Sequence, residues 1–91
     1  MKDKQINATQ KLPWRPKTHW LKIEPAYFLA HEAGVKHFEI RYNDRDFRVG
    51  DMVVLQKWDG KFMGETLTKQ ITYISDYPVA LKQGFVVLQL K

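Results

Sequence analysis

The sequence contains no cysteine. The absence of thiols excludes disulfide bonds, a thiolate zinc site and a cysteine nucleophile. It also favours a reducing, cytoplasmic location, because small secreted domains usually need disulfide bonds. No apolar run approaches the roughly 18 residues that a membrane-spanning helix requires, and the first residues lack the apolar core of a signal peptide. We therefore expect a cytoplasmic protein with no membrane partner.

The chain of 91 residues provides material for one small domain. Domains of this size bury only about 60–65% of the surface that the unfolded chain exposes, which excludes an enzyme with a separate cofactor domain. Hydrophobic residues make up 44% of the sequence and charged residues 27%. This balance is too apolar for intrinsic disorder and too charged for a membrane bundle, so it predicts a globular domain.

Basic residues exceed acidic ones by 15 to 10, and most of this excess lies at the N-terminus. Residues 1–18 carry five basic side chains and one acidic side chain, whereas the other 73 residues carry ten basic and nine acidic ones. Pro13 and Pro16 disfavour a helix in this stretch, so residues 1–18 are predicted to form an extended basic arm. The arm is either a solvated tail or a segment that contacts phosphates.

Residues 19–91 are predicted to form a mainly β domain with one helix. Alternating apolar residues indicate a strand over residues 19–24, and Pro25 and Gly34 mark the start and end of a short helix. Further strands are predicted at residues 37–42, 52–58, 67–74 and 85–90. One short helix between strands one and two suggests a small closed or half-closed barrel of about five to six strands. Closure would remove exposed strand edges.

The predicted helix has a small apolar face and an aromatic face. Helical spacing places four small or aliphatic residues on the face expected to lie against the sheet, namely Ala26, Leu29, Ala30 and Ala33. Tyr27, Phe28 and His31 then point to the other side. The rings of Tyr27 and Phe28 are candidates for stacking against a base, unless the N-terminal arm covers them.

The segment 34–51 concentrates the side chains that can carry chemistry. Glu39 and Arg41 share one face of the predicted strand, opposite its apolar face, so both can address one polar ligand. Arginine offers planar, bidentate donors for a phosphate or a base edge. Glu39 can accept from an exocyclic amine or orient its basic neighbours, and Lys36 can act as a ligand clamp or a general base. Alternatively, these residues form a network of salt bridges that satisfies itself.

Asn43 and Asp44 are typical of a turn, because both side chains can bond the backbone two residues on. Arg45 and Arg48 follow directly and are candidates for the rim of a basic groove. The three histidines have no acidic partner at a recurrent metal spacing, which favours surface or packing roles and no metal site or cofactor. No nucleophile-elbow, phosphate-loop or zinc-protease motif occurs.

The residues Gly34-x-Lys36-x-x-Glu39-x-Arg41 resemble the GxKxxExR signature of the ASCH domain, a branch of the PUA-like superfamily. The longer string from Asn43 to Asp51, NDRxFxxGD, is similar to a short, uncharacterised ASCH subgroup of phage and bacterial genomes. The resemblance runs from about His19 to Leu90. It implies a PUA-like mixed β-barrel, with a helix beside a cleft that the motif lines, and a family whose members bind RNA or modified nucleobases.

The same resemblance implies an enzymatic alternative. Some small bacterial ASCH proteins hydrolyse an acetylated cytidine with a lysine and a threonine of the motif and a distant glutamate, and other relatives act as ribonucleases. Lys36 matches the lysine, whereas Glu39 stands in place of the threonine. Glu65 is not assigned to the position of the distant glutamate. Lys36 and Glu39 are the catalytic candidates if the protein is an enzyme, a question that the sequence leaves open.

The leading hypothesis is a module that binds RNA or a modified nucleotide in this cleft, with additional phosphate contacts from the arm. The candidate binding residues are Tyr27, Phe28, Lys36, Glu39, Arg41, Asn43 and Arg45. The alternatives are a small hydrolase centred on Lys36, which would act on an N-acyl nucleoside or on RNA, and a phage or bacterial protein-interaction module. The sequence does not determine the oligomeric state.

Overall fold

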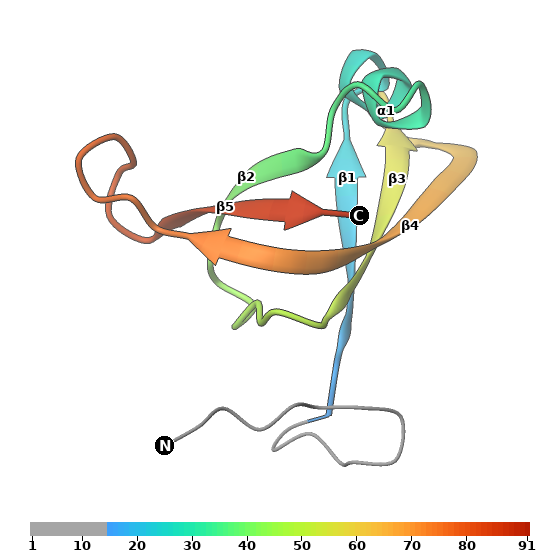
Figure 1. Cartoon of the computed structure of the whole chain (residues 1–91). Helices are drawn as coiled ribbons and strands as arrows, with labels where there is room; N and C mark the ends of the chain where they lie inside the picture. The colour runs from blue at the N-terminus through green and yellow to red at the C-terminus, as the bar shows by residue number, and fades with distance from the viewer. Residues whose placement is uncertain (1–14) are drawn as a thin grey trace.

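The computed structural model describes residues 15–91, which form five strands and one helix (Figure 1). The elements are β1 (Thr18–Ile23), α1 (Pro25–Glu32), β2 (Phe38–Tyr42), β3 (Met52–Trp58), β4 (Phe62–Ser75) and β5 (Phe85–Leu90). The prediction of a mainly β domain with one helix between the first two strands is confirmed. Most of the predicted arm, residues 1–14, lies outside the described part. Within residues 15–91 no helix is long and apolar enough to cross a membrane.

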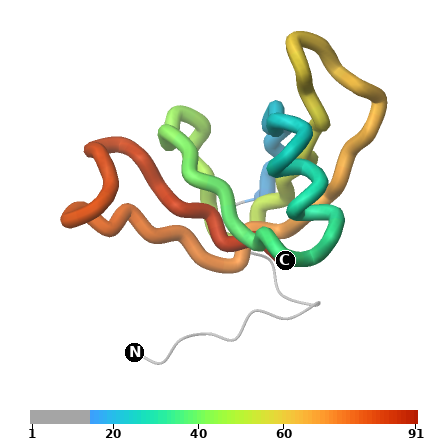
Figure 2. Tube along the Cα trace, turned by 90° about the horizontal axis from the view of Figure 1, so that it is seen from above, coloured from blue at the N-terminus to red at the C-terminus, as the bar shows by residue number. Residues whose placement is uncertain are grey.

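The strands form one mixed sheet in the order β1-β3-β4-β5-β2. β1 runs parallel to β3, and all other pairs are antiparallel. β4 belongs to both halves of the sheet, because its first part pairs with β3 and its last part pairs with β5. The register shifts between Ile71 and Tyr73, where the strand passes from one half to the other. Figure 2 shows β2 and β5 on one side and β1, β3 and α1 on the other.

The sheet does not close, so the prediction of a closed barrel is wrong: β1 and β2 are its two edges and do not pair with each other. Arginine side chains bridge this gap. Nη2 of Arg41 donates to the carbonyl oxygen of Lys22 at 2.8 Å, and Nη1 of Arg45 donates to that of Trp20 at 2.6 Å. These carbonyl groups on the edge of β1 are therefore satisfied by side chains instead of a neighbouring strand.

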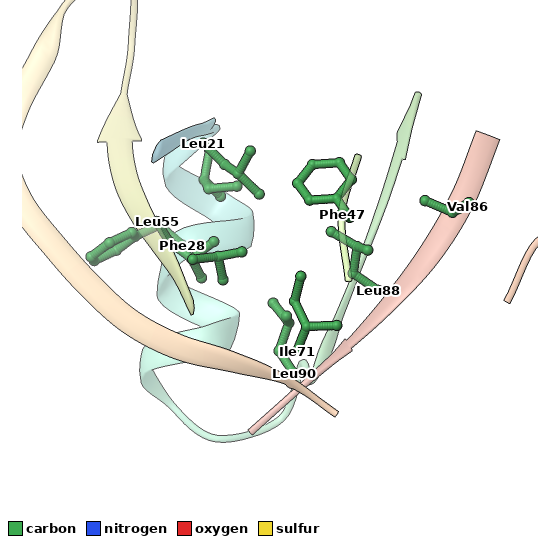
Figure 3. Packing of buried hydrophobic residues seen from close by; sticks show 10 residues of the cluster. Leu21, Phe28, Phe47, Leu55, Ile71, Val86, Leu88 and Leu90 are labelled. Atoms are coloured by element: carbon green, nitrogen blue, oxygen red, sulfur yellow. The ribbon is translucent and has the colours of Figure 1, made fainter. Parts of the chain in front are cut away.

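The hydrophobic core lies between the two halves of the sheet (Figure 3). It contains Leu21, Ile23, Phe28, Phe47, Val53, Leu55, Ile71, Val86, Leu88 and Leu90. Every strand except β2 contributes to it, and Phe47 enters from the loop between β2 and β3. β2 is thus held by its hydrogen bonds to β5 and by polar contacts.

The predicted orientation of α1 is wrong. Phe28 and His31 are buried with 1% of their surface exposed, whereas Leu29 is 50% exposed. Phe28 and His31 lie three residues apart and so share a face of the helix. An aromatic ring buries far more apolar area than a set of alanines, so Phe28 and not the small residues decides which face packs inward.

β2 turns its charged face inward. Glu39 is only 6% exposed, whereas Phe38, Ile40 and Tyr42 are 44%, 50% and 55% exposed. The alternation of apolar and charged residues that the sequence predicts is present. The carboxylate of Glu39 can be buried because it contacts three polar side chains, those of His31, Lys36 and Arg41.

Replacing Gly84 with alanine is expected to lower the free energy of unfolding by about 1–3 kcal/mol. Gly84 has a φ of +88°, which side chains disfavour, and a Cβ there would stand 2.5 Å from Cε1 of Tyr42. Gly60 is the matched control, since its φ is +73° and its Cβ would meet nothing. Urea denaturation should show a larger cost for Gly84→Ala than for Gly60→Ala. Equal costs would mean that the ring of Tyr42 does not press on Gly84.

Candidate functional site

Three adjoining cavities of about 300, 290 and 170 Å³ lie beside β2. Residues of β1 line the first and the third, whereas the second lies between α1 and β2. The first two share Tyr27, Glu39 and Ile40, and the first and third share Arg41 and Tyr42. We call them together the seam groove. Its principal polar and aromatic lining residues are Tyr27, Lys36, Glu39, Arg41, Tyr42 and Arg45.

Glu39 is the centre of the polar network beneath β2. Its Oε2 accepts from Nε2 of His31 at 2.8 Å and from Nζ of Lys36, and its Oε1 lies 3.4 Å from Nη2 of Arg41. Burial raises the pKa of this carboxyl, but the hydrogen bonds from Lys36 and His31 and the charges of Lys36 and Arg41 together lower the pKa below its ordinary 4.5. Glu39 is therefore an ionised anchor for two cations of the groove.

Lys36 is held at the junction between α1 and β2. Its backbone N–H donates to the carbonyl of Ala30 at 3.1 Å, and its Nζ donates to the carbonyl of Phe38 at 2.8 Å and to Glu39. The ammonium group also lies 4.7 Å from the ring centre of Phe38 and 5.1 Å from that of Tyr27. Two of its three N–H donors are thus engaged, and one can reach a ligand.

The guanidinium group of Arg41 is held in place through one nitrogen atom, Nη2, which makes two hydrogen bonds. Its Nη2 group donates to the carbonyl of Lys22 at 2.8 Å and to Glu39 at 3.4 Å. A guanidinium group carries five N–H donors, so three have no partner among residues 15–91. The side chain is 27% exposed and lines two of the cavities. Such an arrangement suits a planar or phosphate-like anion, which the remaining N–H groups can bind in a bidentate manner.

Arg45 lines the far end of the groove, where it contacts the backbone of β1 and the carboxylate of Asp44 at 3.8 Å. Asn43 lines none of the three cavities, because its Oδ1 accepts from the N–H of Phe47 at 3.0 Å and so builds the turn. Phe28 lies in the core and offers no surface to a ligand. The other five candidates, Tyr27, Lys36, Glu39, Arg41 and Arg45, come together in the groove.

Arg48, a candidate for the rim of the groove, lines none of the three cavities. Its Nε lies 3.3 Å from Oδ2 of Asp46.

The sequence analysis did not identify Tyr42 or His31 as residues of this region. Tyr42 has the same parity as Phe38 and Ile40, so it looked like one more residue of an apolar face. No local spacing rule connects His31 with Glu39, since the two come together through the chain reversal after α1.

A second buried histidine–carboxylate pair lies outside the groove. Oδ2 of Asp51 accepts from Nε2 of His19 at 2.8 Å and from the N–H of Arg48 at 3.1 Å, and Oδ1 accepts from the N–H of Lys17 at 2.9 Å. Burial raises the pKa of Asp51, but these hydrogen bonds and the charge of His19 together lower the pKa below its ordinary 3.8. The ring of His19 packs edge-on against Phe47. This pair fastens the start of β1 to the loop before β3.

These two carboxyl groups predict a loss of stability in acid. The pKa of Glu39 and of Asp51 is lower in the folded state than in the unfolded chain, so the unfolded state binds protons first as the pH falls. Their contribution is complete above about pH 5 and is lost progressively below about pH 4. Circular dichroism melts from pH 7 to pH 3 should show this decline, and Glu39→Gln should make it shallower. An unchanged pH dependence in the variant would contradict the role of Glu39.

The chain is similar to a phage protein and to one protein family. An uncharacterised 12.9 kDa protein in the GpA 3′ region of Escherichia phage P2 is 34% identical over 61 residues, which are 66% of this chain and 56% of the phage protein. The chain thus spans little more than half the length of that relative. Residues 18–90, which include all of β1 to β5 and the groove, match the model described as Domain of unknown function (DUF3850). The chain therefore belongs to the DUF3850 family.

Proposed function

We propose that the seam groove binds single-stranded RNA or a modified nucleotide, with a phosphate held by Arg41 and Lys36. The observation that carries the proposal is the guanidinium group of Arg41, which is positioned by Glu39 and the backbone of β1 while three of its N–H donors have no partner within residues 15–91. A group held in this way loses little conformational entropy when an anion binds, so binding retains more of the interaction energy.

The charge of the groove supports this assignment. Its basic lining residues are Lys22, Lys36, Arg41 and Arg45, and its acidic ones are Glu24, Glu39 and Asp44. Four positive and three negative charges leave a net charge of +1, which suits a single phosphodiester group better than a polyphosphate. The exposed rings of Tyr27 and Tyr42 border the same space and can contact bases.

The resemblance of residues 34–41 to the ASCH signature supports the same function, and a PUA-like ancestry is part of the proposal. The family match does not itself make that assignment. A location in the cytoplasm follows from the absence of cysteine and is likewise proposed. The predicted phosphate contacts of the basic arm concern residues that lie mostly outside the described part, so the proposal rests on the groove.

A hydrolase centred on Lys36 is the alternative. Its Nζ is bound to Glu39 and to the carbonyl of Phe38, and Glu39 has both oxygens engaged. Either group would have to give up these contacts to act on a substrate, so the geometry favours binding over turnover. Chromatography of RNA and of N-acetylcytidine after incubation with the protein should recover both unchanged. Turnover that disappears in Lys36→Ala would establish the hydrolase instead.

Arg41→Ala is expected to weaken the binding of a single-stranded RNA octamer about 10- to 100-fold, because a charge-assisted hydrogen-bonding group is lost. Fluorescence anisotropy at about 150 mM salt measures the affinity, and a thermal melt checks that the variant is folded. Lys61→Ala is the matched control, since it removes one positive charge from the exposed turn between β3 and β4. Equal affinities of Arg41→Ala and the wild-type protein would refute the proposal and favour a protein partner for the exposed face of β2.

A further inference from the structure

Tyr42 ends β2 beside Arg41 and is 55% exposed. Its ring borders two cavities of the seam groove, of about 300 and 170 Å³, and Arg41 borders the same two. A ligand whose anionic group contacts Arg41 would therefore extend past Tyr42 in either direction along the groove.

The ring of Tyr42 is held in place from two sides. Its centre lies 5.4 Å from that of Phe85, and the two planes meet at 67°, which is an edge-to-face contact. It also lies against the backbone of Gly84, where a Cβ would stand 2.5 Å from its Cε1. The N–H of Asn43 donates to the carbonyl of Gly84 at 2.8 Å and fastens this part of the chain to the end of β2. A fixed ring with exposed surface loses little entropy when a planar group stacks on it.

Two other aromatic rings of the groove, those of Tyr27 and Phe38, are already in contact with a cation. Nζ of Lys36 lies 5.1 Å from the ring centre of Tyr27 and 4.7 Å from that of Phe38. Among residues 15–91 no cation contacts the ring of Tyr42 in this way. Tyr42 thus offers an exposed ring beside Arg41, whereas Phe47, which lines one of the same cavities, is only 5% exposed.

We propose that Tyr42 is the stacking platform for an unpaired nucleobase whose phosphate is bound by Arg41. This inference rests on the proposed function and specifies its ligand. Stacking on an aromatic ring requires a base whose face is open, which a base inside a duplex does not offer. The site therefore takes a single-stranded nucleic acid or a free nucleotide, and it tolerates different bases because every base has a π-face.

The test compares three RNA probes of equal length: a single-stranded octamer, the same octamer as a duplex, and an octamer with abasic sites throughout. The wild-type protein should bind the single strand about 5- to 100-fold more tightly than the abasic strand, the effect of one stacked base. The duplex should bind as weakly as the abasic strand. These comparisons need no substitution, so they do not depend on whether a variant folds.

Tyr42→Ala should abolish the preference for the single strand over the abasic strand, and Tyr42→Phe should restore it in part because the ring is kept. Tyr77→Ala is the control, since Tyr77 is 59% exposed and lines none of the groove. If the wild-type protein binds the single strand and the abasic strand equally, the role of Tyr42 is overturned while that of Arg41 stands. If it binds none of the probes, the proposed function itself fails, and the role of Tyr42 fails with it.

Discussion

Asp51→Ala should lower the free energy of unfolding by about 3–5 kcal/mol, because it removes a buried carboxylate that accepts three hydrogen bonds. The side chain of Asp51 is fully buried and accepts from three donors, the ring of His19 and the N–H groups of Lys17 and Arg48. Alanine removes the carboxylate that accepts these three hydrogen bonds, and the ring of His19 is itself buried. The contact between the start of β1 and the loop before β3 is lost as well.

Urea denaturation followed by circular dichroism measures this effect. Asp44→Ala is the matched control in the same loop, because the Asp44 side chain is 64% exposed and its ion pair with Arg45 spans 3.8 Å. Exposed pairs of this kind contribute only about 0–1 kcal/mol. If Asp51→Ala costs no more than Asp44→Ala, the buried pair does not hold β1 in place.

Glu39→Leu should lower the free energy of unfolding by about 2–4 kcal/mol. Glu39 is the sole hydrogen-bond partner of the His31 imidazole within the described part of the chain, and it also pairs with Lys36 and Arg41. The buried Nδ1 atom of His31 has no hydrogen-bond partner among residues 15–91. Removal of Glu39 therefore leaves the buried imidazole without a hydrogen bond to any of these residues, which is the costly part of the substitution.

A double-mutant cycle separates this pair from its surroundings. Replacing both Glu39 and His31 by leucine removes the acceptor and the donor together, so the double variant should be more stable than the sum of the two single costs predicts. Glu65→Ala is a control, since the side chain of Glu65 is 51% exposed beside Lys57. A coupling energy near zero between Glu39 and His31 would contradict the account of this network.

Local signals in the sequence predicted most elements of the fold. Period-two alternation located β1 and β2, and apolar, β-branched runs located β3 and β5, all to within a residue at each end. Pro25 and Gly34 marked the limits of α1. β4 was predicted over residues 67–74 but begins at Phe62. Its early part is exposed and contains Gly64, so it lacks the apolar alternation that identifies a half-buried strand.

The arrangement of these elements depends on contacts that no local pattern encodes. The open edge between β1 and β2 is bridged by Arg41 and Arg45, which reach carbonyl groups 19 and 25 residues away in sequence. The inward turn of Glu39 likewise depends on His31, which lies on a different element. The alternation of residues in β2 predicts one apolar and one charged face, but it does not determine which face is buried.

The candidate site was predicted better on its charged side than on its aromatic side. Glu39 and Arg41 lie two residues apart on a strand, so their common face follows from backbone geometry alone. The aromatic residues depend on packing, since Phe28 belongs to the core and Tyr42 is held outside it by Gly84 and Phe85. Helical periodicity over eight residues was too short a signal to rank one aromatic ring above four small residues.

The measurement that tests the account most directly is an NMR titration of the ¹⁵N-labelled chain with a short single-stranded RNA at about 150 mM salt. We expect saturable amide shifts at Tyr27 and within the stretch from Lys36 to Arg45, because this stretch contains most of the residues that line the seam groove. Shifts confined to residues 2–17 that fade as the salt concentration rises would indicate nonspecific phosphate contacts by the basic arm. That result, with the amides of the groove unmoved, would contradict the proposal that the groove binds RNA.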